Sequence, residues 1–127
     1  MVIEHINPDG MANNPAFSQG TIAPAGRTLY IGGQNGIDAE GNVIEDRAEQ
    51  VAQAMRNLLT VLDAAGATKD DVAKLTIYLH KDLTGEEGYG AVMPVWGRTP
   101  TAVTVVQVAS FARPGVVCEI DAVVALG

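Results

Sequence analysis

The sequence predicts an α+β fold in which two helices cover one face of a mostly antiparallel sheet. Three observations support this class: two segments space their apolar residues as helices do, the remaining apolar segments alternate as strands do, and the order is ββαβαββ. The chain of 127 residues is long enough to bury a core of its own. We therefore expect one domain over residues 1–127.

Two strands are expected before the first helix, at residues 13–22 and 26–37. The segment A-P-A-G joins them, and proline and glycine are the residues that tight turns favour. A second turn follows at residues 38–42, where Gly41 and Asn42 tolerate a positive φ. The sequence thus predicts two strands joined by a turn, with the first helix entered through the second turn.

The strongest helical pattern runs from Asp46 to Gly66. Asp46 is followed three residues later by Glu49, which is the spacing of a capping box, and Gly66 stands where a helix commonly ends. The apolar residues between these ends repeat at helical spacing; they are Ala48, Val51, Met55, Leu58, Leu59 and Leu62.

A strand and a second helix are predicted next, at residues 71–81 and 83–97. Alternation in the strand places Lys74, Thr76, Tyr78 and His80 on one face and apolar residues on the other. Thr84 and Glu87 again have capping-box spacing, but three glycines and Pro94 weaken the second helix, since each glycine costs about 1 kcal/mol. This helix is expected to need support from the rest of the fold.

The last two strands are predicted at residues 101–111 and 115–126, around the turn A-R-P-G. The final strand reads as core, yet Glu119 and Asp121 point to the same face of it, and Cys118 points to the other face, toward the helices. Carboxylates are rarely buried without a partner. Because both helices cover one face, the other face is expected to meet another subunit.

Composition excludes several classes of function. A net charge of −7 with scattered basic residues argues against a nucleic-acid partner, and no apolar run approaches the roughly 20 residues of a membrane span. His5 and His80 have no ligand set near them at metal spacing, so we expect no metal. The N-terminus does not resemble a signal peptide, and a single cysteine favours the reducing cytosol, so a cytoplasmic location is expected.

Five segments, in order and at suitable spacing, resemble the Rid family, the reactive intermediate (imine/enamine) deaminases also called RidA, YjgF or liver perchloric-acid-soluble proteins. They are F-S-Q-G (17–20), Y-I-G-G-Q (30–34), N-L-L-T-V-L-D-A-A-G-A (57–67), D-D-V-A-K-L-T-I-Y-L (70–79) and C-E-I-D-A-V-V (118–124). The resemblance implies a chorismate-mutase-like fold and a homotrimeric barrel with small-molecule clefts between subunits. It also implies hydrolysis of reactive imines and enamines without metal or cofactor.

The resemblance suggests roles for the two acids of the last strand. Glu119 occupies the position of a family glutamate that reaches the intersubunit cleft and positions the attacking water. Asp121 falls where the family also places an acid. The alternative is that both carboxylates only accept hydrogen bonds at the trimer seam; we favour the catalytic role for Glu119 and the structural role for Asp121.

Other implied substrate-binding positions have lost polar groups. Phe17 matches a family tyrosine that borders the cleft, so its ring is kept and the hydroxyl is absent. Gly32 and Gly33 match the Ser-Gly of the family's Ser-Gly-Gln, in which the glycine lets a ligand approach the backbone. Gly90 falls near a family asparagine on the second helix.

The largest departure is at the position of the family arginine, which grips the substrate carboxylate bidentately within Pro-Ala-Arg-Ser/Thr. Counting from Pro100 puts Ala102 at that position, and counting back from V-Q-V puts Val103 there, with Thr104 also expected to bind substrate. Arg98 is four or five residues upstream, roughly 13–16 Å along an extended strand, too far to replace the arginine from the same strand.

Two functions remain open on this evidence. The first is a Rid-type enzyme that hydrolyses an imine, enamine or related electrophile lacking the usual α-carboxylate, with Glu119 as general acid/base. The second is a non-catalytic trimer that binds a metabolite or another protein. A ribonuclease activity is a third possibility that the acidity of the chain disfavours.

Overall fold

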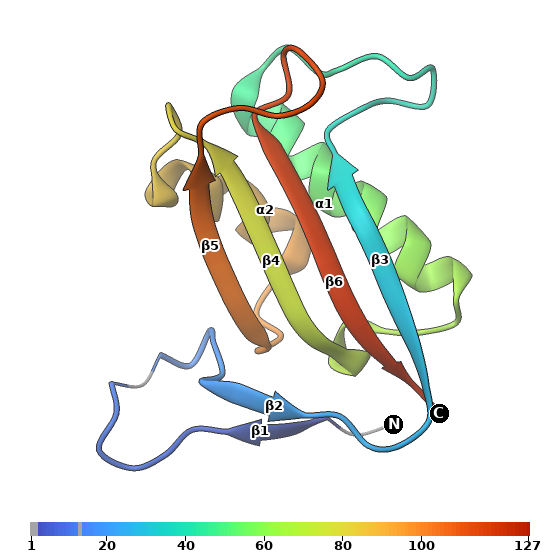
Figure 1. Cartoon of the computed structure of the whole chain (residues 1–127), viewed down its shortest axis with the longest axis vertical. Coiled ribbons are helices and arrows are strands. Elements are labelled where there is room, and N and C mark those ends of the chain that lie inside the picture. The colour runs from blue at the N-terminus through green and yellow to red at the C-terminus, as the bar shows by residue number, and fades with distance from the viewer. Residues whose placement is uncertain (1–2, 13) are drawn as a thin grey trace.

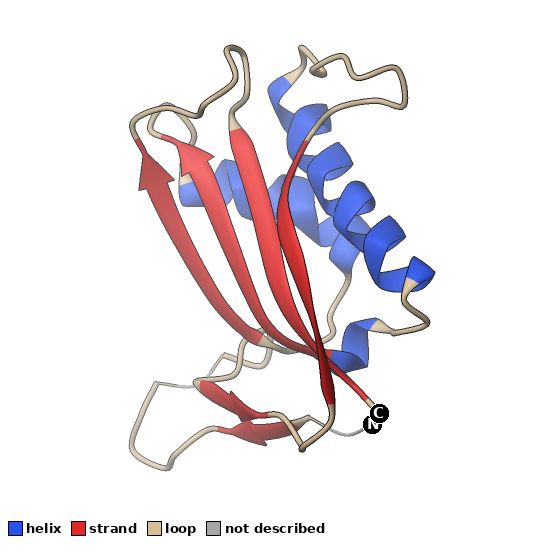
Figure 2. Ribbon diagram, turned by 45° about the vertical axis from the view of Figure 1, so that its right-hand side comes forward, coloured by secondary structure: helices blue, strands red, loops and turns tan. Residues whose placement is uncertain are grey.

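A four-stranded sheet with two helices on one face forms the body of the computed structural model, which describes residues 3–12 and 14–127 (Figures 1 and 2). The strand order is β3-β6-β4-β5, with β6 antiparallel to both neighbours and β4 parallel to β5. The predicted α+β class with a mostly antiparallel sheet is therefore confirmed. The bounds are β3 (Arg27–Asn35), α1 (Arg47–Ala64), β4 (Val72–His80), α2 (Gly85–Trp96), β5 (Ala102–Val108) and β6 (Cys118–Leu126).

Helix α1 begins and ends at the residues that the sequence indicated. The Asp46 side chain accepts a hydrogen bond from the Glu49 backbone N–H at 2.9 Å, and Gly66 takes a φ of 75° just beyond the last turn. The Glu49 carboxylate pairs with Arg56 and does not close the predicted box. Only half of the capping box is formed, which is enough to fix the start of the helix.

Helix α2 forms despite its glycines, and one of them explains why it can. Thr84 and Glu87 make the complete capping box, with both bonds at 3.1 Å. Gly88 faces the sheet, and a Cβ there would come within 2.6 Å of the Leu79 side chain. The glycine therefore lets α2 lie close to β4, and burial of Val92 and Trp96 supplies the support that this helix needs.

The predicted strand at residues 13–22 is wrong over most of its length. Residue 13 lies outside the described residues, and residues 14–17 form a turn in which the Phe17 N–H donates to the Asn14 carbonyl at 3.0 Å. Only Gly20–Ile22 is a strand (β2), and it pairs with β1 (Glu4–Ile6) in a separate two-stranded sheet at one end of the molecule (Figure 1). The proline at 15 lacks an N–H, which favours the turn over a strand.

The last two strands are not neighbours, because β4 lies between them. Both are shorter than predicted, and the loop that joins them passes over the end of β4 (Figure 1). Pro114 and Gly115, with a φ of 86°, keep the predicted strand at 115–126 from starting before Cys118. A short 3-10 helix at Lys69–Asp71 was also not predicted.

The core lies between the sheet and the helices, and Cys118 is part of it, as alternation predicted. The side chain is fully buried among apolar residues. Burial raises the pKa of the Cys118 thiol to about 12, with a smaller contribution from the charge of Glu119. The thiol therefore stays protonated and packs as an apolar group. In the described part of the chain, none of the helices is both long and apolar enough to cross a membrane.

Candidate functional site

Glu119 lies on the face of the sheet that the helices leave open. It is opposite Asn35 on β3 and opposite Tyr78 on β4, and it is half-buried. The Asn35 Nδ2 donates to Glu119 Oε1 at 3.2 Å and to the Cys118 carbonyl at 3.2 Å. Both partner atoms are acceptor oxygens, so the Asn35 amide must point its nitrogen toward them. A neutral side chain therefore holds one oxygen of this carboxylate.

A β-bulge in β3 makes room for the same carboxylate. The pairing of β3 with β6 shifts between Ile31 and Gln34, so Gly32 and Gly33 form the bulge. A Cβ at Gly33 would come within 2.5 Å of the Glu119 Cδ, whereas one at Gly32 would meet nothing within 4 Å. The glycine that the family comparison singled out is thus needed at position 33 because the carboxylate crosses its backbone.

Asp121 has a partner of its own on the open face. The Tyr78 hydroxyl donates to Asp121 Oδ2 at 3.1 Å. This hydrogen bond and the negative charge of Asp121 raise the pKa of Tyr78. The contact is compatible with the structural role expected for Asp121, because the carboxylate is held by a side chain of the adjacent strand.

The open face also carries Ala102 and Thr104. Ala102 is opposite Lys74, whose Nζ donates to Thr104 Oγ1 at 2.6 Å. Among the described residues no ion pair involves Glu119. The carboxylate and the lysine are four residues apart along their paired strands, since Glu119 is opposite Tyr78 and Lys74 is opposite Val123.

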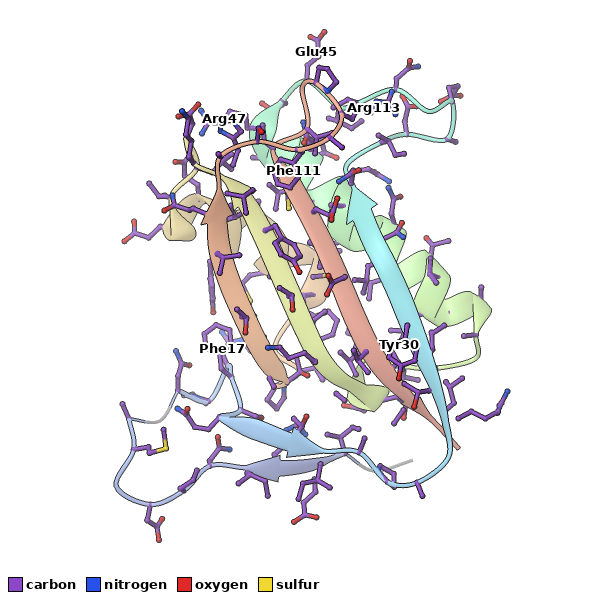
Figure 3. All side chains as sticks on the ribbon, viewed as in Figure 1. Phe17, Tyr30, Glu45, Arg47, Phe111 and Arg113 are labelled. Carbon is purple, nitrogen blue, oxygen red and sulfur yellow. The ribbon has the colours of Figure 1, made fainter. Side chains whose placement is uncertain are left out.

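Val103 points to the other side of the sheet, into an apolar groove beside α2. The groove has a cavity volume of about 60 Å³. Phe17 and Tyr89 meet edge to face at its rim, with ring centroids 6.2 Å apart. Phe17 is held there because its backbone forms an isolated β-bridge with Thr101, and Figure 3 shows its ring beside the start of β5, across the sheet from Tyr30 on β3. The other lining side chains include Leu75, Ile77, Val92, Met93, Trp96 and Val105.

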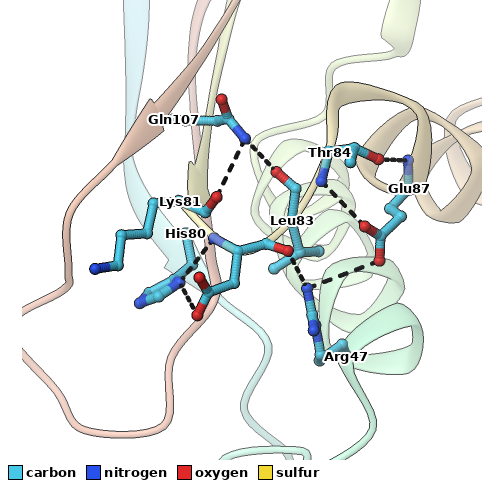
Figure 4. Close-up of polar contacts among 8 residues, drawn as sticks. Arg47, His80, Lys81, Leu83, Thr84, Glu87 and Gln107 are labelled. Atoms are coloured by element: carbon cyan, nitrogen blue, oxygen red, sulfur yellow. Dashed lines mark hydrogen bonds and ion pairs between the residues drawn. The ribbon is translucent and has the colours of Figure 1, made fainter.

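Gly90 does not line this groove. It borders a different hollow on α2, with Arg47 and Glu87. In that region Arg47 Nη2 donates to the Asp82 carbonyl at 2.6 Å, and His80 Nδ1 accepts from the Asp82 N–H at 3.1 Å (Figure 4). His80 thus stabilises the turn before α2, and the described residues contain no group of three or more potential metal ligands.

The predicted site residues therefore do not meet within one chain. Ala102 and Thr104 lie beside Lys74 on the open face and Gly90 lies on α2, and the other residues form two groups. Glu119 and Gly33 lie together near β3, whereas Phe17 and Val103 lie together beside β5. Two strand spacings, about 10 Å, three residues along the paired strands and the thickness of the sheet separate Glu119 from Val103. The sequence interpretation missed Asn35 as a site residue, because its contact with Glu119 depends on the register set by the bulge. It also missed Tyr89, because a position on the second helix does not reveal that the ring contacts Phe17.

The fold and these residues define an α+β protein with an acid on an open sheet face and an apolar groove at the sheet edge. The family model described as Endoribonuclease L-PSP matches residues 10–126. The chain therefore belongs to this family, which is the Rid family. A crystal structure of a Rid-family protein of unknown function, YyfB from Yersinia pestis, superimposes with a TM-score of 0.87 and 32% identity, covering 99% of this chain and 100% of that one.

Curated relatives match over shorter stretches. A RutC family protein from Aquifex aeolicus is 40% identical over 52 residues, which cover 40% of this chain and 42% of the relative. A rat protein named 2-iminobutanoate/2-iminopropanoate deaminase is 38% identical over 66 residues, which cover 50% of this chain and 47% of the relative. The chain thus matches less than half the length of each of these relatives. The chorismate-mutase-like fold expected from the resemblance is confirmed by the solved Rid-family structures.

Proposed function

We propose that the chain hydrolyses a small imine, enamine or related electrophile that lacks the usual α-carboxylate, with Glu119 as general acid/base. The observation that carries this proposal is the setting of the Glu119 carboxylate. Asn35 holds Oε1, and no described residue donates a hydrogen bond to Oε2, which lies above Gly33. That oxygen is free to contact water or substrate.

The chemistry requires only a proton carrier and water. The Glu119 carboxylate takes a proton from a water molecule as the water oxygen bonds to the carbon of C=N. The same group gives this proton to the nitrogen, which yields a carbinolamine. It then carries the proton of the carbinolamine hydroxyl to the nitrogen, and the C–N bond breaks as the C=O bond forms, so the imine and water become a carbonyl compound and ammonia. The name of the rat relative, 2-iminobutanoate/2-iminopropanoate deaminase, supports imine hydrolysis as the reaction class.

The apolar groove supports a substrate without an α-carboxylate. Val103 lines the groove beside Phe17. Counting back from V-Q-V in the sequence puts this valine at the position of the family arginine. A carboxylate placed there would be desolvated without a cation, which is costly. A neutral group adjacent to the reacting carbon avoids this cost.

The two groups of site residues support a site shared between copies of the chain. Glu119 and Gly33 on one chain cannot reach Phe17 and Val103 of the same chain around the sheet. A second copy that brings its β5 edge toward the first copy's Glu119 would unite them, as in the homotrimer that the family implies. The open face, with the exposed Val106 at 39%, is the surface that such assembly would cover.

The test compares a neutral imine with a 2-imino acid in wild type and variants. Glu119→Gln keeps the shape of the side chain and should abolish turnover of the neutral imine. Val103→Arg should raise kcat/KM for the 2-imino acid about ten- to a hundredfold, the effect of one charge-assisted contact. Ala102→Arg, which places the arginine on the opposite face, is the control. Wild-type turnover of 2-imino acids at the higher rate would contradict the proposal.

A non-catalytic binding protein is the second candidate, and the loss of polar groups at Phe17 and Val103 favours it. Such a protein would bind a metabolite saturably without consuming it, and Glu119→Gln would leave that binding unchanged. For either function we propose a cytoplasmic location, because the unpaired Cys118 is suited to a reducing compartment.

A further inference from the structure

Arg98 lies next to the apolar groove, although it is remote from Val103 along the chain. Gly97, with a φ of 82°, ends α2, and Arg98 follows it. Arg98 lines a cavity of about 370 Å³ together with Asn14, Pro15, Ala16, Tyr89 and Met93. The last three of these residues also line the groove. The apolar groove therefore adjoins a wider cavity that carries a guanidinium group.

The Arg98 guanidinium is available to a ligand. Among the described residues it makes no ion pair and no side-chain hydrogen bond. It is not required to cap α2, because Lys69 Nζ already donates to the Val95 and Trp96 carbonyls, at 3.2 and 2.6 Å. Asn14 Oδ1 accepts from the Ala16 N–H at 2.9 Å, which holds the opposite wall of the cavity in place.

We propose that Arg98 binds a carboxylate on the substrate that is separated from the reacting carbon by a hydrocarbon spacer lying in the groove. This inference rests on the proposed function and names its substrate class: an electrophile with a remote carboxylate and a neutral reacting end. Arginine suits the task because its planar donors match a carboxylate bidentately. An α-carboxylate would instead fall beside Val103, among apolar side chains.

The negative charge of the chain means that an anionic ligand would need a cation such as Arg98 close to its binding site. With a net charge of −7, the protein as a whole repels anions, so a carboxylated ligand needs a local cation. The groove supplies apolar contact and Arg98 supplies the charge, at adjoining places. A ligand that is apolar at one end and anionic at the other therefore fits both.

Binding of unreactive probes to the full chain tests the proposal without turnover. Hexanoate should bind, measured by calorimetry and by NMR shifts of the Trp96 indole and the Arg98 Nε–H. Arg98→Gln should weaken hexanoate binding about ten- to a hundredfold, the range for a hydrogen-bonded charge. It should leave the binding of hexan-1-ol unchanged. Arg113→Gln, in a remote loop where Nη2 contacts the Gly41 carbonyl, is the control and should alter neither.

Two outcomes would overturn the assignment: equal weakening of hexanoate by Arg98→Gln and Arg113→Gln, or hexanoate binding that leaves the Trp96 indole unshifted. Propanoate should bind more weakly than hexanoate because it cannot fill the groove and reach Arg98 together. If hexanoate binds as expected while no imine is hydrolysed, the carboxylate site is supported and the hydrolytic function is wrong. A failure of the Arg98 assignment can thus be told apart from a failure of the proposed hydrolytic function.

Discussion

Gly33→Ala is the smallest change that should displace the Glu119 carboxylate. The added Cβ would come within 2.5 Å of Glu119 Cδ and 2.8 Å of its Cγ, whereas ordinary contacts begin at 3.4 Å. The carboxylate must therefore move by about 1 Å. Gly33 is not among the glycines with positive φ, so the backbone itself accepts alanine. The substitution therefore changes mainly the position of the Glu119 carboxylate.

The expected effect is large on catalysis and small on stability. A displacement of about 1 Å from the productive geometry costs on the order of 10²-fold in rate. Glycine-to-alanine replacement at a permissive φ stabilises by roughly 0.4–1 kcal/mol through the unfolded chain, and the crowding opposes this. We therefore expect kcat/KM for a neutral imine to fall about a hundredfold, with the free energy of unfolding within about 1 kcal/mol of wild type.

The assay pairs turnover of a neutral imine with urea unfolding of the same preparations. Gly20→Ala on β2 is the matched control, because a Cβ there meets nothing within 4 Å and its φ is also not positive. The reasoning is refuted if Gly33→Ala retains wild-type kcat/KM, or if Gly20→Ala loses as much. A crystal structure of Gly33→Ala should show the carboxylate withdrawn from Asn35.

Three further predictions concern stability and partners. Since the pKa of Cys118 is raised from 9.0 to about 12, the thiol should lower the free energy of unfolding between these pH values, by at most about 4 kcal/mol. Cys118→Ala should make that fall smaller, and the raised pKa of Tyr78 accounts for part of what remains. Gln50→Ala should lower the free energy of unfolding in urea by about 2–4 kcal/mol. The buried Gln50 amide donates hydrogen bonds to the Ile44 and Gly115 carbonyls and accepts one from the Val117 N–H. At about 0.1 M salt, submicromolar protein should neither shift nor cleave RNA; a salt-sensitive band shift would contradict this.

The helices could be predicted from the sequence because local chemistry sets their ends. The Asp46 and Thr84 caps act over three residues, and the φ of Gly66 depends on its own backbone. The bounds of β2 could not be predicted in the same way. Its partner is β1, whose three residues give no alternating pattern long enough to recognise.

The candidate site was predictable only where alternation along one strand decides the matter. Glu119 and Cys118 lie on opposite faces because they are adjacent on β6, and the sequence shows this. Asn35 reaches Glu119 because a bulge shifts the register of β3, and a bulge cannot be located from one sequence. Arg98 borders the groove through packing of the turn after α2 against residues 14–16, which is a tertiary effect.

The two ways of counting the family arginine place it on opposite faces of β5. Ala102 is opposite Lys74 on the open face, and Val103 is opposite Leu75 on the groove side. An arginine introduced at position 103 would therefore lie beside Phe17, whereas one at position 102 would lie beside Lys74 and Thr104. If only Val103→Arg improves turnover of a 2-imino acid, the substrate carboxylate lies in the groove, and the β5 edge of a second copy must bring that groove to Glu119.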